Sequence, residues 1–223
     1  MEQYIGHGAR IREKLLNSRS NLMPDYEILE ILLCMALPRR DTKALSKELT
    51  TKYGSFAKVI SAEPESLLEV KGVGQSVLAA FQLIKESATR LTKEEINNKP
   101  IISSWKSLIA YCRSLMGHTK KEIFLVLYLN NQNELIGEDI QDYGTVDQIN
   151  IYPREIVKKA LFFNASAIIL AHNHPSGCTK ASRDDIETTK QIQTALLPFK
   201  ILIHDHVIIS DRSFFSFKSE GLL

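Results

Sequence analysis

The chain has 223 residues, of which 44% are hydrophobic and 24% charged, as in an ordinary globular protein. Lysines and arginines exceed acidic residues by only two, so any nucleic-acid binding needs a local site. No apolar run approaches the roughly 20 residues that span a bilayer, and the first ten residues lack the apolar core of a secretion signal. The three cysteines are widely spaced and odd in number, which argues against a disulfide framework or a thiolate zinc cluster. We therefore expect a cytoplasmic protein of one or two domains, without membrane contact.

The first ninety residues predict a series of short helices. Pro38 ends the second of them, and the wide apolar stripe of that helix predicts that most of it is buried. Asp41 can cap the third helix, and Gly54 follows closely enough to terminate it. The first expected helix starts with residues 9–16, and the next two cover residues 25–36 and 42–49.

Residues 67–81 predict a short helix, a tight turn and a second helix that begins near residue 75. Gly72 and Gly74 permit the backbone geometry of such a turn, and the N–H groups at the start of the second helix can hold a phosphate. Lys71 adds a cation beside the turn. This pattern is similar to a helix-hairpin-helix and predicts weak, sequence-independent contact with DNA. The alternative is a hairpin that serves only as a packing unit or a protein contact.

A polar segment at residues 93–99 precedes Pro100, and we place a domain boundary there, between domains 1–99 and 100–223. Beyond the boundary the pattern changes from helices to alternating strands and helices. The helices expected in this second part cover residues 103–116, 153–162 and 182–197, and the strands cover 122–129, 135–141, 165–171, 200–210 and 213–217.

Two histidines follow the apolar run at 165–171 and define the candidate site of the chain. His172 and His174 are two residues apart, so they project to the same side of a strand. Asp185 comes eleven residues after His174, in the first turn of a helix that begins near Ser182. Two nitrogens and one carboxylate oxygen leave a fourth tetrahedral position for water, which is the arrangement of a catalytic zinc. The alternatives are ordinary histidines and a helix cap formed by Ser182 without any metal.

These motifs resemble the JAMM (JAB/MPN-type) zinc metallohydrolases, and the wider sequence is similar to the bacterial RadC-like proteins. The resemblance implies an α+β chain with an all-α helix-hairpin-helix domain before a JAB/MPN domain, whose mixed β-sheet is flanked by helices. It also implies hydrolysis of peptide or isopeptide bonds with Zn²⁺ as cofactor. The segments that carry the resemblance are residues 129–133, 152–157, 164–167, 172–177, 205–209 and 220–223.

The resemblance further implies a carboxylate that takes a proton from the attacking water. In similar proteins it is a glutamate five positions ahead of the glycine of a Gly-Thr or Gly-Ser step. Counting back from Gly144 gives Asp139 rather than glutamate, with Glu138 beside it. We favour Asp139 by position and keep Glu138 as the alternative. The resemblance gives the Ser182 hydroxyl the role of stabilising the oxyanion of the tetrahedral intermediate.

Three further residues near these motifs have two interpretations each or carry a weaker signal. His204 and His206 form a second His-x-His pair, but no carboxylate follows at matching spacing. We interpret His206 as a structural residue or as support for a metal ligand. Cys178 lies in the loop between the ligands and is interpreted as a bystander, with an approach to the metal as the alternative.

The same residues also bear on other functions. A zinc deaminase requires His-x-Glu and Pro-Cys-x-x-Cys, and both are missing around His172 and Pro175. A two-metal nuclease would need more convergent carboxylates. The alternative that stays open is an adaptor in DNA repair or recombination that binds DNA or protein and whose metal domain is structural or inactive. The sequence leaves the substrate and the oligomeric state unassigned.

Overall fold

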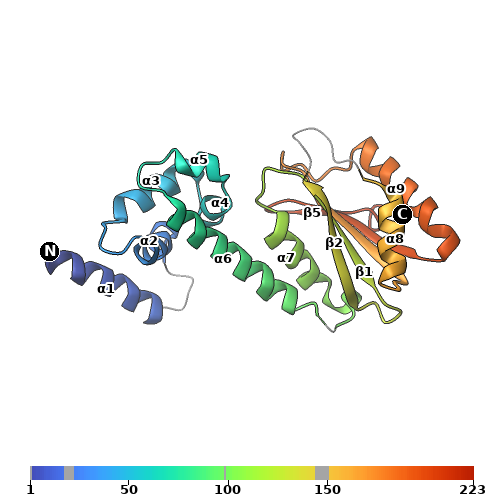
Figure 1. The fold of residues 1–223 in the computed structure, drawn as a ribbon, viewed down its shortest axis with the longest axis horizontal. Coiled ribbons are helices and arrows are strands. Elements are labelled where there is room, and N and C mark those ends of the chain that lie inside the picture. Colours follow the sequence, from blue (N-terminus) through green and yellow to red (C-terminus); the bar gives the residue numbers. More distant parts are fainter. Residues whose placement is uncertain (1, 18–22, 98, 144–150) are drawn as a thin grey trace. The chain divides into compact units, whose positions relative to one another are not determined.

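The computed structural model describes residues 2–17, 23–97, 99–143 and 151–223, and Figure 1 gives the order of the elements. The chain divides into two compact units, Met1–Ser87 and Ala88–Leu223. This division lies within helix α6, earlier than the boundary at 99/100 that the sequence favours, which stays a prediction. The fold is α+β: a helical N-terminal region is followed by a mixed five-stranded sheet with helices.

The first unit is built from helices whose apolar faces share one core. Leu29 and Leu33 of α2 are fully buried there with Leu49 of α3, as the wide apolar stripe predicts. The helices are α1 (Glu2–Asn17), α2 (Asp25–Ala36), α3 (Lys43–Tyr53), α4 (Phe56–Ile60), α5 (Pro64–Leu68) and α6 (Gln75–Glu94), which continues into the second unit.

Asp41 and Gly54 flank α3 as expected, although the helix begins one residue later than predicted and its N-cap residue is Thr42, whose side chain makes no capping bond. The Asp41 carboxylate accepts a hydrogen bond from the Lys43 amide at 3.0 Å. Gly54 has a φ of 96°, and its N–H donates to the carbonyl of Thr50 at 2.8 Å. The left-handed backbone at Gly54 explains why the helix ends at a glycine.

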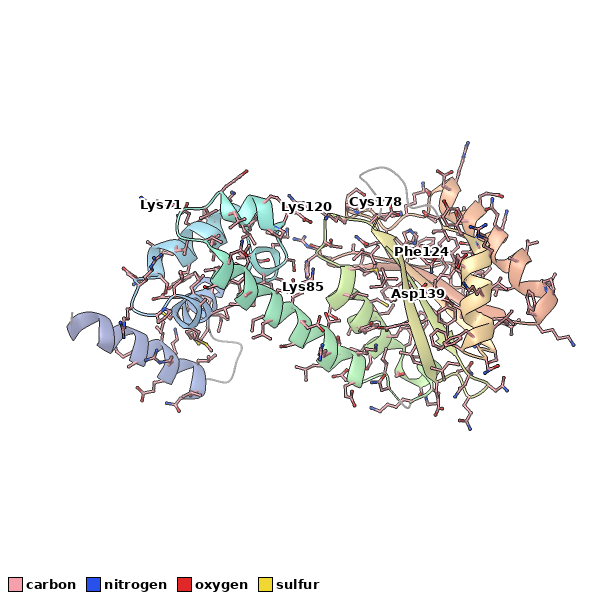
Figure 2. All side chains as sticks on the ribbon, viewed as in Figure 1. Lys71, Lys85, Lys120, Phe124, Asp139 and Cys178 are labelled. Carbon is pink, nitrogen blue, oxygen red and sulfur yellow. The ribbon has the colours of Figure 1, made fainter. Side chains whose placement is uncertain are left out.

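The turn between α5 and α6 has buried valines on one side and an exposed lysine on the other. Val70, Val73 and Val77 are buried in the core of the first unit. Gly72 has a φ of 100°, a conformation that favours glycine, and Lys71 beside it is exposed. The valines therefore hold the backbone of the turn, and Lys71 projects from it (Figure 2).

The second unit is a sheet with the strand order β2-β1-β3-β4-β5. The β3–β4 pair is parallel, whereas β1–β2, β1–β3 and β4–β5 are antiparallel, so the sheet is mixed (Figure 1). The strands are β1 (Ile123–Leu129), β2 (Leu135–Tyr143), β3 (Ala167–Asn173), β4 (Leu202–Ile209) and β5 (Phe214–Ser216). The other elements are η2 (Ile101–Ser104), α7 (Trp105–Met116), α8 (Pro153–Phe162), α9 (Arg183–Leu196) and η3 (Leu197–Phe199).

Helices cover both faces of this sheet, and β1 shows the alternation between them. Leu125 and Leu127 belong to the core that includes α7. Phe124, Val126 and Tyr128 belong to a second core that includes α8 and α9. Every residue of β1 is buried, because successive side chains enter one core and then the other. Even-numbered positions of β1 and β3 therefore face α8 and α9.

Element boundaries differ from the expected ones where short turns intervene. The helix expected from residue 103 begins at Trp105, because the hydroxyls of Ser103 and Ser104 donate to the Pro100 carbonyl within the η2 turn. The strand expected from residue 122 begins at Ile123, which leaves Glu122 just outside it. Within the described residues, no helix combines the length and apolar character that crossing a membrane requires.

Candidate metal site

The two histidines of the motif reach the site from the end of β3. His172 pairs with Phe124 of β1, is 1% exposed, and its ring stacks on the Phe124 ring with centroids 5.9 Å apart. His174 follows the strand, and its Nδ1 lies 2.7 Å from the Cys178 carbonyl oxygen. A carbonyl oxygen only accepts, so the Nδ1 of His174 carries the proton and its Nε2 faces the site. A turn over residues 174–177 brings the Cys178 carbonyl back to the His174 ring. In this turn Gly177 has a φ of 77°, and its N–H donates to the His174 carbonyl at 2.8 Å.

Asp185 reaches the same place from the first turn of α9. Ser182 is the N-cap of this helix, and its hydroxyl oxygen accepts from the Asp185 amide at 3.0 Å. In return, the Asp185 carboxylate accepts from the Ser182 amide and from the Ser182 hydroxyl, each at 2.7 Å. This reciprocal capping box fixes the carboxylate at the helix start. The helix cap and the candidate ligand set thus share Asp185.

The candidate ligand atoms lie within a few ångströms of one another. The Nε2 atoms of His172 and His174 are 2.9 Å apart. The Asp185 carboxylate lies 3.1 Å from the His172 Nε2 and 3.4 Å from the His174 Nε2. Burial alone would raise the pKa of Asp185, but its contacts with the imidazoles of His172 and His174 hold that pKa well below its ordinary value. The same contact with Asp185 raises the pKa of His174.

A second carboxylate, Glu122, joins the histidines from the start of β1. One ligand atom from each of Glu122, His172 and His174 lies within 4.8 Å of the other two, a grouping that could hold a metal ion. Phe124 pairs with His172, and Glu122 and His174 each lie two residues beyond this pair, one before the start of β1 and the other after the end of β3. Both residues line a pocket of about 210 Å³ that also reaches Asp185. The sequence reasoning missed Glu122, although it is the one carboxylate at the head of an otherwise apolar run.

The two carboxylates that the sequence reasoning favoured lie elsewhere. Asp139 is on β2 (Figure 2). It lies opposite Val126, and its partners are Lys159 and Gln141. Strand β1 separates β2 from β3, so Asp139 is two strands away from His172. The structure therefore corrects the expected placement of Asp139. Gly144, from which its position was counted, lies outside the described residues.

Glu138 is directed to the opposite face of the sheet from the histidines. Its carboxylate accepts from the Lys93 ammonium and from the Tyr111 hydroxyl of α7, each at 2.7 Å. Side chains of adjacent strand residues point to opposite faces, and the described register of β2 is regular at this point. Glu138 thus stabilises the α7 side of the sheet, and its expected place beside the metal ligands is corrected as well.

His206 supports His172 from the neighbouring strand, as its interpretation from sequence allows. Its Nε2 lies 2.8 Å from the His172 Nδ1, and its Nδ1 lies 2.7 Å from the Thr189 hydroxyl oxygen. Complete burial, and then the nearby His172, lower the pKa of His206 well below its ordinary value. His206 is therefore neutral at neutral pH and carries a single ring proton.

Known proteins identify the family of this chain. The RadC-like JAB domain family matches residues 102–222, which is more than half of the chain. A UPF0758 protein of Rhodobacter capsulatus is 44% identical over 213 residues, spanning 96% of this chain and 100% of the relative. The chain belongs to the RadC-like JAB family. A UPF0758 protein of Ruegeria pomeroyi is 42% identical over 224 residues and spans 100% of both chains.

Asn173, between the two histidines of the RadC-like JAB domain, links β3 to the beginning of β1. Its side-chain oxygen accepts from the Ile123 amide at 2.8 Å, and its side-chain nitrogen donates to the Lys121 carbonyl at 3.0 Å. These two backbone groups flank Glu122 in the sequence. Asn173 therefore holds the segment that carries Glu122 beside the end of β3.

The remaining residues near the RadC-like JAB site do not join the ligand cluster. Cys178 is exposed (Figure 2). It contacts His174 through its backbone carbonyl. The His204 ring contacts the side chain of Asn133, and burial lowers the pKa of His204. The second His-x-His pair thus divides its roles, with His206 at the site and His204 away from it.

Proposed function

We propose that the RadC-like JAB domain is a zinc-dependent hydrolase that cleaves an amide bond of a peptide or protein substrate. The observation that carries this proposal is the convergence of two histidine nitrogens and two carboxylates in one pocket. One such carboxylate would suffice as a ligand, so the second is available for proton transfer.

The residues present fit a metal ion. The Nε2 atoms of His172 and His174 are 2.9 Å apart, and two lone pairs at that separation repel unless a proton or a cation lies between them. The Asp185 carboxylate is ionised and already faces both nitrogens. Nitrogen and oxygen donors in this number are the ligands of catalytic zinc. We assign His172, His174 and Asp185 as the residues that would hold Zn²⁺.

Zn²⁺ held there supplies Lewis acidity, which polarises an amide carbonyl and lowers the pKa of water to about 7. Glu122 is the residue proposed to take the proton of the attacking water and pass it to the leaving amine. It lines the pocket opposite His174, outside the capping box that holds Asp185. The Ser182 hydroxyl, which donates to Asp185 here, is proposed to turn to the oxyanion of the substrate.

Metal analysis tests the site directly. We expect protein purified without added metal to hold about one zinc per chain, because three protein ligands suffice for a catalytic site. His174→Ala should lose most of this metal, since only two of the three proposed protein ligands remain. His204→Ala is the matched control, because His204 belongs to the other His-x-His pair and contacts Asn133. Near-zero zinc in the parent protein, or equal loss in the control, would refute the assignment.

A second candidate function is a DNA- or protein-binding adaptor, and the turn between α5 and α6 favours its DNA-binding form. Buried valines fix the backbone of the turn, while Lys71, Gly72 and the first residue of α6 are exposed. A fixed, exposed turn beside a helix start suits contact with a phosphate, with Gly72 and Gly74 allowing close approach. Such contact could also place the hydrolase near DNA.

The full-length chain should then bind duplex DNA with little sequence preference, and its affinity should fall steeply as salt rises. Lys71→Glu is expected to weaken binding about 10-fold or more, because a phosphate contact becomes a repulsion. Fluorescence anisotropy with labelled duplexes measures both effects. Lys58→Glu makes the same charge change at another exposed lysine of the first unit. Equal losses in the two variants would mean that the turn is not the contact.

A further inference from the structure

A chain of hydrogen bonds behind the ligands runs from α9 through β4 to His172. The Thr189 hydroxyl donates to the Asp185 carbonyl, one helical turn earlier, at 2.6 Å. The same oxygen lies 2.7 Å from the His206 Nδ1, and the His206 Nε2 lies 2.8 Å from the His172 Nδ1. The chain thus begins on the backbone of one proposed ligand and ends on the ring of another.

The number of available protons determines which atom donates in each of these hydrogen bonds. A carbonyl oxygen can only accept, so the single hydroxyl proton of Thr189 is used on Asp185. The contact between Thr189 and the His206 Nδ1 then requires the ring nitrogen to donate. Complete burial of His206 disfavours a charged ring, so a His206 whose single proton is on Nδ1 has a bare Nε2, which must accept a proton from the His172 Nδ1.

We propose that Thr189 is a positioning residue that sets the tautomers of His206 and His172 so that the His172 Nε2 lone pair faces the ligand cluster. This inference rests on the proposed function in naming the metal as the group that uses the lone pair. With the His172 proton held on Nδ1, Nε2 is the ring atom left for coordination. A threonine without direct contact to the metal thereby prepares one of its ligands.

The surroundings of His206 exclude other partners that would set its proton. Its side chain is completely buried between the rings of Phe217, with centroids 4.5 Å apart, and Phe124, with centroids 5.6 Å apart. Among the described residues, its ring nitrogens contact Thr189 on one side and His172 on the other. A buried N–H without an acceptor costs free energy, so removing the Thr189 oxygen should move the proton.

The reversed arrangement shows what Thr189 prevents. If His206 carried its proton on Nε2, it would donate to the His172 Nδ1. His172 would then keep its own proton on Nε2, where Asp185 lies 3.1 Å away and can accept it. That proton would occupy the position where a metal must bind, and coordination would first require its removal.

Nuclear magnetic resonance of the full-length protein tests the proton arrangement without any variant. In protein labelled with ¹⁵N-histidine and freed of metal by a chelator, long-range ¹H–¹⁵N correlations distinguish the two tautomers of each ring. We expect His206 to carry its proton on Nδ1 and His172 to carry a proton on Nδ1. A proton on the His206 Nε2 in this spectrum overturns the inference.

Variants of Thr189 test the consequence for the metal. Thr189→Val removes the acceptor and is expected to move the His206 proton to Nε2 and to weaken Zn²⁺ binding about 10- to 100-fold, measured by competition with a chromogenic chelator. Thr189→Ser keeps the hydroxyl and should restore both the tautomer signal and the affinity. Thr194→Val is the matched control, since the exposed Thr194 donates to the carbonyl four residues earlier in the same helix.

The two proposals fail in different ways. If His206 holds its proton on Nδ1 but the parent protein binds no Zn²⁺, the metal assignment fails and the proton arrangement is supported. If zinc binds and Thr189→Val leaves both the tautomer and the affinity unchanged, the role of Thr189 is overturned and the metal site stands. An equal loss in Thr189→Val and Thr194→Val also overturns it, because the effect would then belong to the helix.

Discussion

Glu122→Gln is expected to reduce amide hydrolysis about 10²- to 10⁴-fold while the protein keeps its zinc, because a general base is lost and the three proposed ligands remain. Glutamine matches glutamate in size and accepts no proton at neutral pH. A screen of fluorogenic peptides identifies a substrate of the parent protein, and turnover of that peptide is then compared between the variants. Zinc content is measured on the same samples, so loss of base and loss of metal are separated.

Asp139→Asn is the matched control for this experiment. Asp139 contacts Lys159 and Gln141 and lies two strands from the histidines, so turnover should change less than about threefold. If Asp139→Asn is inactive and Glu122→Gln is active, the proton acceptor is the residue that the motif spacing suggested. If Glu122→Gln instead loses its zinc, Glu122 is a ligand and the base lies elsewhere.

The second large effect is expected on stability, from Asp205→Ala. The Asp205 carboxylate is 3% exposed and accepts from the His206 amide at 2.8 Å, from the Lys218 amide at 3.0 Å and from the Ser216 hydroxyl at 2.6 Å. Alanine would leave these donors without their acceptor. We expect the free energy of unfolding to fall by about 3–5 kcal/mol, since buried donors without partners cost about 1–3 kcal/mol each.

Urea unfolding followed by tryptophan fluorescence measures this loss of stability in the second structural unit, which contains Asp205. The chain has a single tryptophan, Trp105, which belongs to α7 of the second unit. Asp211→Ala is the control, because the Asp211 side chain is 30% exposed and contacts the exposed Arg212. Its free energy of unfolding should stay within about 0.5 kcal/mol of the parent value. Similar shifts in both variants would mean that the buried hydrogen bonds of Asp205 contribute little.

Local sequence signals predicted the helices whose ends are marked by a proline. Residues 25–36 and 153–162 form helices over the expected spans, because Pro38 follows the first closely and Pro153 begins the second. The convergence of His172, His174 and Asp185 was equally predictable, since strand alternation and a helix cap place them within a short segment. These features depend on neighbours in the sequence, so a pattern of residue types is sufficient to find them.

The position of Glu122 beside the histidines depends on strand pairing instead, and no local spacing in the sequence predicts it. Glu122 lies 52 positions before His174 and meets it because β1 is antiparallel to β3 with Phe124 opposite His172. The sequence reasoning sought the base by counting from Gly144, which assumes that the carboxylate and the glycine belong to the same stretch. The contact between Thr189 and His206 was hidden for the same reason, because a helix and a strand that are apart in the sequence create it.

The two hydrogen bonds of Asn173 favour one register between β1 and β3. A slip of β1 by one residue along β3 would turn every side chain of β1 to the other face of the sheet. Glu122 would then point away from the histidines, and Asn173 would lose both the Ile123 amide and the Lys121 carbonyl. The three proposed ligands could still converge in such a chain, since they come from the end of β3, the residue that follows it, and α9. On the proposed mechanism, such a chain would keep the three proposed ligands and lack the proposed base, so only a chain with the correct strand register would combine the two.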